Sequence, residues 1–267
     1  MELGLNGRVS IVTGGSKGIG RAIAMSLAQE GVHVTICARG TESLAEVQKE
    51  VQQCGGKIVA MRANVTAPDD VQRVVLATIE QFGRIDILVN NAGGPIKFAG
   101  FLELTDEDWH EAFDLNVMSV VYFARYTLSW LRQSPAARII NISSISGIEP
   151  GSYNPHYTVT KAAIINLSKY LANQLAQDGV LVNVVCPGPV YSDSWDRNVQ
   201  RLADIRNISL HEARGQVEKE EKFKIPLGRI GTGDDVAALV TFLASDQAAW
   251  ITGSCFHVNG GKLRSMC

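Results

Sequence analysis

A tyrosine and a lysine stand four positions apart in the stretch NPHYTVTK, residues 154–161. In a helix, Tyr157 and Lys161 would lie one turn apart on the same face. A free phenol has a pKa of about 10, which is too high for efficient proton exchange at neutral pH. A lysine ammonium beside it favours the phenolate and is expected to lower that pKa by about 1–3 units, and Pro155 is typical of a first helical turn, where the helix dipole also favours negative charge. The pair therefore indicates a proton-transferring tyrosine, although a Tyr-x-x-x-Lys spacing alone also arises by chance.

A glycine-rich turn, TGGSKGIG at residues 13–20, follows directly after an apolar, β-branched run. Its glycines, Gly14, Gly18 and Gly20, have G-x-x-x-G-x-G spacing rather than the more common G-x-G-x-x-G. Glycines make the tight turn, let backbone N–H groups approach a pyrophosphate and allow the next helix to pack close to the strand. The N-terminus of that helix then faces the phosphates. The turn therefore predicts a dinucleotide site, with a simple tight turn as the alternative.

The end of the second apolar run indicates which dinucleotide is bound. An acidic residue there would bind the ribose 2′-hydroxyl of NAD and repel a 2′-phosphate. The sequence has Cys37-Ala38-Arg39 at this point, with no acid. Arg39 can bind a phosphate through two parallel hydrogen bonds, and Lys17 in the glycine turn adds a second positive charge. We therefore predict NADP(H) rather than NAD(H), the alternative for Arg39 being a solvated loop residue.

Apolar runs alternate with helical patterns along the whole chain, which predicts βαβ units and a parallel sheet. The runs are nearly continuous in apolar residues, as expected for strands buried on both faces. The elements fill the length, so we predict a single α/β domain over residues 1–267, with a seven-stranded parallel sheet flanked by helices. The expected strands are 8–13, 32–37, 57–63, 85–91, 138–143, 180–186 and 255–259, and the expected helices lie near 20–30, 42–54, 68–82, 106–133, 154–178 and 233–245.

The segment 191–225 interrupts this alternation after the sixth expected strand. It is charged, but its seven acidic and seven basic residues balance. One interpretation is a solvated helical insertion; the other is a helical substrate lid, because loops at the carboxyl ends of parallel strands carry ligands. Capping-box spacing, with an acid three residues after the cap, predicts helix starts at Thr105, Ser209 and Thr232.

The composition argues against several classes of protein. The chain is 46% apolar and 19% charged, and its net charge of −2 argues against nucleic acid or an anionic membrane as the main partner. We see no signal peptide and no apolar stretch of about 18 residues, so no membrane span is expected. The five cysteines are dispersed, which favours reduced thiols in the cytoplasm; Cys37, Cys186 and Cys255 are expected to be small core residues. Because the histidines and cysteines are isolated, no metal site is expected.

Six ordered motifs carry a resemblance to a known family. The chain resembles the short-chain dehydrogenase/reductase (SDR) family over essentially residues 1–263, and its closing ITGSCFHVNGG (251–261) looks most like the 3-oxoacyl-[acyl-carrier-protein] reductase branch. The resemblance implies a Rossmann fold, a nicotinamide cofactor, hydride transfer at a carbon–oxygen centre and a homotetramer or homodimer. The motifs are TGGSKGIG (13–20), NNAG (90–93), Asn116 in DLNV, Ser144 in NISSISG, YTVTK (157–161) and the Pro-Gly pair at 187–188.

The resemblance implies catalytic roles for four residues. Tyr157 would be the general acid in reduction and the base in oxidation, with Lys161 tuning it and bonding the nicotinamide ribose. Asn116, a poor helix former inside a good helix, would hold a water that relays protons to Lys161; its alternative is a local hydrogen-bonding role. Ser144 has the spacing to Tyr157 that the family expects and would hydrogen-bond the substrate oxygen. Ser143 and Ser146 lie close by, but only Ser144 stands three residues before a glycine.

The resemblance also implies a set of cofactor contacts. Asn64 and Val65 match the segment that flanks adenine, and Asn91 would hold the turn near the adenine ribose. The Pro187–Gly188 turn and Val190 would press on the nicotinamide. Ser192 stands where the family usually has threonine and keeps the hydroxyl for the carboxamide. The full expected set is Gly14, Ser16, Lys17, Gly18, Ile19, Gly20, Arg39, Asn64, Val65, Asn91, Tyr157, Lys161, Pro187, Gly188, Val190 and Ser192.

The expected substrate pocket is apolar, which suits a ketone with hydrophobic substituents. His156, beside the catalytic tyrosine, is expected at its rim. Each expected lining residue has ordinary packing as its alternative role. The expected lining residues are Ile96, Phe98, Ile145, Ile148, Tyr153, Tyr191 and Trp195.

These features together predict an NADPH-dependent carbonyl reductase that acts on a small ketone or alcohol. The alternative is a 3-oxoacyl-[acyl-carrier-protein] reductase. Against it, the segment 191–225 is longer than such reductases usually carry, and Pro135 and Asp178 stand where that branch has basic residues for docking an acidic carrier protein. A distant alternative is an NADP-binding regulatory protein, which would not need the full catalytic set.

Overall fold

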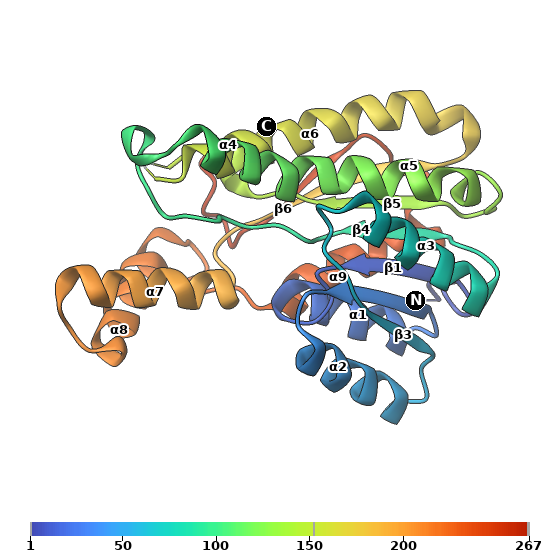
Figure 1. Ribbon diagram of the computed structural model, residues 1–267, viewed down its shortest axis with the longest axis horizontal. Helices are drawn as coiled ribbons and strands as arrows, with labels where there is room; N and C mark the ends of the chain where they lie inside the picture. Colours follow the sequence, from blue (N-terminus) through green and yellow to red (C-terminus); the bar gives the residue numbers. More distant parts are fainter. Residues whose placement is uncertain (1, 152, 266–267) are drawn as a thin grey trace.

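Parallel strands form one seven-stranded sheet in the computed structural model, which describes residues 2–151 and 153–265 (Figure 1). The strand order is β3-β2-β1-β4-β5-β6-β7, so the chain crosses from one side of β1 to the other between β3 and β4. Such a reversal opens a crevice at the carboxyl ends of the central strands, where open α/β sheets bind ligands. The strands are β1 (Val9–Thr13), β2 (His33–Ala38), β3 (Ile58–Arg62), β4 (Ile87–Asn90), β5 (Arg138–Ile142), β6 (Leu181–Pro187) and β7 (Cys255–Val258).

Helices cover both faces of the sheet (Figure 1). Each face has its own apolar core, because the inner strands present apolar side chains on both sides. In the described part of the chain, no helix is long and apolar enough to cross a membrane. One face carries α1 (Gly18–Gln29), α2 (Thr41–Gln53) and α9 (Gly233–Ala244), and the other carries α3 (Pro68–Phe82), α4 (Asp106–Phe113), α5 (Ser119–Leu131) and α6 (Pro155–Leu175).

The predicted strands are confirmed, and their bounds differ from the expected ones by no more than two residues. The edge strands β3 and β7 are partly exposed, whereas β1, β4 and β5 are fully buried. Cys37 and Cys186 are buried as predicted. Cys255 is exposed because β7 has a neighbour on one side only, so its assignment to the core was wrong. Cys267 lies outside the described residues.

Local signals set the helix starts. The capping boxes at Thr105, Ser209 and Thr232 are all formed. The helix expected over 106–133 is instead divided by a π-helical turn, η2 (Asp114–Met118), between α4 and α5. Short 3₁₀ turns also occur at η1 (Phe101–Glu103), η3 (Ile145–Gly147), η4 (Ala176–Asp178) and η5 (Asp246–Ala248).

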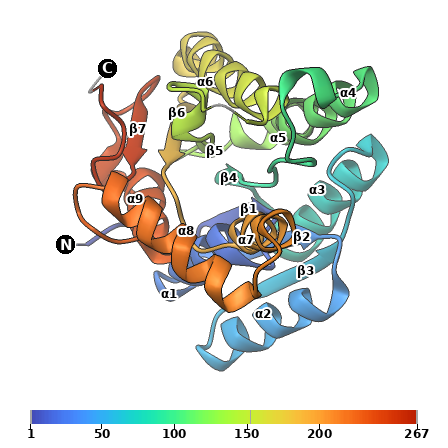
Figure 2. The same ribbon diagram turned by 90° about the vertical axis from the view of Figure 1, so that its left-hand side faces the viewer.

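The segment 191–225, called the lid segment below, is helical, as predicted, and consists of two helices. They are α7 (Asp193–Arg206) and α8 (Leu210–Lys224), joined through Asn207 in the left-handed conformation. Their facing apolar sides form a small core of their own. Figure 2 shows both helices in front of the sheet, outside the two helical layers.

Candidate active site

The first turn of α6 carries Tyr157. The turn begins at Asn154, whose φ of 58° is left-handed. The Asn154 backbone N–H donates to the Ala99 carbonyl at 2.9 Å, and its side-chain oxygen accepts from the Ala99 N–H at 3.1 Å. Pro155 then occupies the first helical position, as predicted. These contacts fix where α6 begins, and hence where Tyr157 stands.

Lys161 lies one turn from Tyr157, but its ammonium faces the ring of the phenol. Its Nζ is 5.6 Å from the ring centroid and donates to the Ile142 carbonyl at 2.9 Å. Burial raises the pKa of Tyr157 to about 12. A hydrogen bond with the Ser144 hydroxyl lowers this pKa, but by less than burial raises it. The predicted lowering of the Tyr157 pKa is therefore wrong for this geometry: the net shift is upward, because loss of hydration outweighs the contacts that favour the phenolate. Burial also lowers the pKa of Lys161 to about 8.

Ser144 is the serine that faces the phenol. Its Oγ accepts from the backbone N–H of Ser146 at 3.2 Å and lies 2.8 Å from the Ser146 hydroxyl. Ser143 is buried and donates to the Lys161 carbonyl at 2.7 Å, so its hydroxyl is used within the fold. The contact with the phenol distinguishes Ser144 from its two neighbours, and its catalytic role stays a prediction.

Asn116 is buried in the π-helical turn and holds a loop rather than touching Tyr157. Its amide nitrogen donates to the Ala112 carbonyl at 3.0 Å, and its Oδ1 accepts from the Gly94 N–H at 2.8 Å. A Cβ at Gly93 would lie 2.6 Å from Asn116 Oδ1 and 3.2 Å from Lys161 Nζ, so the glycine lets both groups approach one stretch of backbone. The local hydrogen-bonding role is therefore present, and the water relay stays a prediction.

The glycine turn is shaped to leave its backbone accessible. Gly14 and Gly18 have φ of 63° and 52°, in the left-handed region. A Cβ at Gly20 would lie 2.2 Å from the Gly14 carbonyl oxygen, so helix α1 can approach the turn only with glycine there. Asn91 secures the turn, because its Nδ2 donates to the carbonyls of Thr13 at 2.9 Å and Gly14 at 3.2 Å.

Thr13 is a residue that the sequence reasoning missed. Its Oγ1 accepts from the backbone N–H groups of Asn91 and Ala92, each at 2.9 Å. It thereby ties the end of β4 to the end of β1, directly before the glycine turn. A hydroxyl residue at the last position of the strand, next to the first glycine, is the signal that was available.

The lid segment touches the glycine turn. The Ser192 hydroxyl accepts from the Trp195 N–H at 3.3 Å and caps α7. A Cβ built at Gly18 would lie 3.5 Å from the Cβ of Ser192, so the two segments are in contact. Lys17 pairs with Asp193 at 3.3 Å. Lys17 is therefore partly neutralised by the lid segment, and the predicted preference for a 2′-phosphate rests mainly on Arg39, which is exposed at the end of β2.

The remaining predicted cofactor residues line the carboxyl ends of the strands. Asn64 accepts from the Thr66 N–H at 3.2 Å, and Val65 is buried beside it. Gly188 donates to the Val258 carbonyl at 2.9 Å, which holds the turn after β6. Ser16 and Ile19 are partly exposed in the glycine turn, Pro187 is buried at the end of β6, and Val190 is buried and pairs with Gly231.

Two expected pocket residues serve packing instead. His156 is fully buried rather than at the rim, and its ring lies 6.2 Å from that of Trp109. Burial lowers the pKa of this imidazole. Trp195 belongs to the small core of the lid segment, with the Tyr191 ring edge-on at 5.8 Å. Ile96, Phe98, Ile145 and Ile148 are partly buried, and Tyr153 and Tyr191 are exposed.

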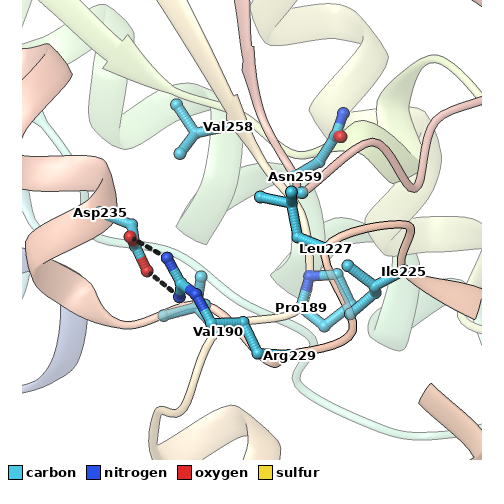
Figure 3. A pocket seen from close by; sticks show the side chains of 10 residues that line it. Pro189, Val190, Ile225, Leu227, Arg229, Asp235, Val258 and Asn259 are labelled. Carbon is cyan, nitrogen blue, oxygen red and sulfur yellow. Dashed lines mark hydrogen bonds and ion pairs between the residues drawn. The ribbon is translucent and has the colours of Figure 1, made fainter. Parts of the chain in front are cut away.

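A cavity of about 100 Å³ lies at the base of the lid segment (Figure 3). Arg229 and Asp235 border it and pair through two hydrogen bonds of 2.7 Å. Its described lining includes neither Tyr157 nor Lys161, so it is not the place where a substrate would meet these groups. The other labelled lining residues are Pro189, Val190, Ile225, Leu227, Val258 and Asn259.

Comparisons with known proteins show which proteins this chain resembles. A protein-family model described as enoyl-(acyl carrier protein) reductase matches residues 14–262. The chain is 37% identical over 254 residues to the 3-oxoacyl-[acyl-carrier-protein] reductase FabG of Staphylococcus aureus, an alignment that covers 94% of this chain and 96% of that protein.

Solved structures resemble the whole fold. L-Sorbose reductase from Gluconobacter frateurii, in complex with NADPH and L-sorbose, superimposes with a TM-score of 0.94 at 32% identity, covering 100% of both chains. An actinorhodin polyketide ketoreductase with NADPH superimposes with a TM-score of 0.90 at 31% identity, covering 97% of this chain and 98% of that one. The similarity thus includes the lid segment as well as the sheet.

Proposed function

This chain belongs to the short-chain dehydrogenase/reductase family of oxidoreductases, and on that premise we propose that it uses NADPH to reduce a ketone to a secondary alcohol. The observation that carries the proposal is the convergence of Ser144, Tyr157 and Lys161 at the first turn of α6. A proton donor and a cation thus lie one turn apart on α6, and a hydrogen-bond donor from the turn after β5 faces the phenol.

The state of the phenol favours reduction. With a pKa of about 12, Tyr157 is protonated at neutral pH and can donate its proton to a carbonyl oxygen. The Ser144 hydroxyl lies beside the phenol and would hydrogen-bond the same oxygen once a carbonyl is bound there. Bound NADPH would supply the hydride. The Lys161 cation, 5.6 Å from the ring centroid, would stabilise the phenolate that the proton transfer leaves.

The residues at the end of β1 and β2 fit NADPH. The turn from Gly14 to Gly20 leaves its backbone open at the start of α1, where N–H groups favour phosphate. Arg39 is exposed at the end of β2 and, within the described residues, forms no ion pair. A free guanidinium there favours a 2′-phosphate over a 2′-hydroxyl.

A 3-oxoacyl-[acyl-carrier-protein] reductase is the second candidate, favoured by the similarity to FabG. One contact supports our preference for a small ketone. Asp178, at a position where we expected carrier docking to need a base, pairs with Arg132 at 2.8 Å. That pair reduces the positive charge which an acidic carrier protein would meet. We further propose a cytoplasmic homodimer or homotetramer built on the outer faces of α5 and α6.

The test compares substrates and variants in one assay that follows NADPH consumption. Wild type should reduce small free ketones, and Tyr157→Phe should lower kcat/KM roughly a hundredfold to ten-thousandfold. Tyr170→Phe is the matched control, because Tyr170 lies on the same helix and is 59% exposed. Full turnover by Tyr157→Phe would overturn the proposal. Far faster turnover of a carrier-linked 3-oxoacyl thioester would favour the second candidate.

A further inference from the structure

One face of α7 presents two arginines to the loop after β4. The Arg201 guanidinium lies over the rings of Phe98 and Tyr153, with 5.9 Å and 5.1 Å to their centroids. One turn earlier, Arg197 Nη2 lies 3.2 Å from the Ser194 hydroxyl and 3.4 Å from the Pro95 carbonyl, a long contact. The two side chains share a face because they are four residues apart in a helix.

The loops that these arginines reach border the catalytic turn. Tyr153 directly precedes Asn154, which bonds Ala99 at the start of α6. On the other side, a Cβ at Gly94 would lie 3.8 Å from Arg197 Nη2, and the Gly94 N–H donates to Asn116. The lid segment therefore presents its arginine face to the loops that border the residues proposed to act on the carbonyl.

Acidic residues of α7 do not neutralise this face. Asp193 pairs with Lys17, Asp196 pairs with Arg214, and Asp204 accepts from Gln200. Several other cations of the lid segment, unlike Arg197 and Arg201, pair with acidic side chains. Those pairs are Arg206–Glu220, Lys222–Glu218 and Lys224–Glu221. Within the described residues, neither Arg197 nor Arg201 has a carboxylate partner.

A guanidinium held on two aromatic faces is well suited to bind an anion. Stacking restricts the side chain of Arg201, so less conformational freedom is lost on binding. These cation–π contacts use no carboxylate partner, so the N–H groups of Arg201 can form two parallel hydrogen bonds to a carboxylate or phosphate. Arg197 adds a second charge on the same face of the helix, which strengthens the attraction for an anion.

We propose that Arg197 and Arg201 bind an anionic group of the substrate, so that the ketone reduced by this enzyme carries a carboxylate or a phosphate. This inference rests on the proposed ketone reduction and narrows its substrate class. It replaces the expectation of a purely hydrophobic ketone. Because both arginines belong to α7, the anion would also join the lid segment to the loops beside Tyr157 and hold the substrate at the catalytic groups.

The test uses pairs of ketones that differ only in charge. Oxo acids of increasing chain length are compared with their methyl esters, and dihydroxyacetone phosphate with dihydroxyacetone. Wild type should favour the anion at least tenfold in kcat/KM in one of the two series, which identifies carboxylate or phosphate as the group. The ratio of kcat/KM for the anion to kcat/KM for its neutral partner should fall in Arg201→Gln and in Arg197→Gln. The fall should be at least tenfold in Arg201→Gln. Arg201→Lys, which keeps the charge but loses the paired hydrogen bonds, should restore part of it.

Two further measurements keep the outcomes separate. Arg206→Gln is the matched control, because Arg206 lies on the same helix and pairs with Glu220; its ratio should equal that of wild type. The affinity for each anion, measured by calorimetry, should be lower in Arg201→Gln than in wild type, including for anions that are bound but not reduced. Equal kcat/KM for acid and ester, or a ratio unchanged in both glutamine variants, would overturn the inference. Absence of all ketone reduction, with anion binding intact, would instead overturn the proposed function.

Discussion

Replacing Lys161 by methionine should make the protein more stable and inactive. The Lys161 residue is only 4% exposed, and its ammonium has the Ile142 carbonyl as its hydrogen-bond partner. Burial lowers its pKa from 10.5 to about 8. Methionine has a similar length, is apolar and fills irregular space, so it should fit the site without the cost of burying a charge.

The size of the effect follows from the pKa. A difference of about 2.5 pH units corresponds to roughly 3 kcal/mol against the charged form in the folded protein. Losing the hydrogen bond to Ile142 offsets about 1 kcal/mol of the gain. At pH 7 the free energy of unfolding should therefore rise by about 2 kcal/mol in Lys161→Met, which corresponds to a rise in Tm of roughly 4–8 °C for a chain of this size.

The sign of the pH dependence is fixed by the same shift. Below pH 8 Lys161 is protonated in both states, so the cost of burying it is fully present in the wild type. Between about pH 8 and 10.5 the folded state releases the proton and the unfolded state keeps it, so wild-type stability rises relative to the variant. The advantage of Lys161→Met should therefore be largest at neutral pH and shrink as the pH rises to about 10.5.

Urea unfolding of wild type, Lys161→Met and Lys169→Met at a series of pH values measures this difference. Lys169 is the control because it lies on α6 but is exposed. Its substitution should change stability little and with no pH dependence over this range. A Lys161→Met variant that is less stable than wild type at pH 7, or whose advantage does not depend on pH, would refute the reasoning.

Three other outcomes are expected. For ketone reduction, log kcat/KM should fall above about pH 8 as Lys161 loses its proton, and a profile that stays flat to pH 10 would contradict the role of the cation. The double change Ala38→Asp with Arg39→Leu should shift kcat/KM from NADPH toward NADH at least about tenfold, whereas equal use of both cofactors by wild type would contradict the assignment. Gly20→Ala should weaken NADPH binding in a fluorescence titration, because the new Cβ would lie 2.2 Å from a backbone oxygen of the same turn; Gly215→Ala, in open space on α8, should leave it unchanged.

Features encoded within a few neighbouring residues could be predicted from the sequence. The box at Ser209 starts α8 because a hydroxyl and an acid three residues later satisfy each other's backbone groups. A contact between distant residues was expected only from the family resemblance: Asn91 holds the glycine turn through the carbonyls of Thr13 and Gly14. For the capping box, both hydrogen-bonding residues lie within four positions of each other. For Asn91, the NNAG motif indicates the contact.

Features that depend on burial by distant segments could not be predicted. The π-helical turn at Asn116 forms because its amide bonds both Ala112 and the loop at Gly94. His156 was expected at a rim, yet Trp109 from α4 covers it. The pKa of Tyr157 went in the opposite direction to the prediction, because residue spacing places the lysine nearby without saying how much water the fold removes.

The start of α6 breaks several local rules at once, all within two turns of Tyr157. Asn154 has a left-handed backbone, which costs a non-glycine residue of order 1–3 kcal/mol unless its surroundings hold it, as Ala99 does here. His156 is fully buried, and neither ring nitrogen has a hydrogen-bond partner among the described residues. Lys161 adds a buried charge. Because these costs lie within two turns of helix and none is needed to close the sheet, their persistence is best explained by catalysis. Substitutions that remove these costs should raise stability and lower turnover together, whereas truncations in the apolar core lower stability.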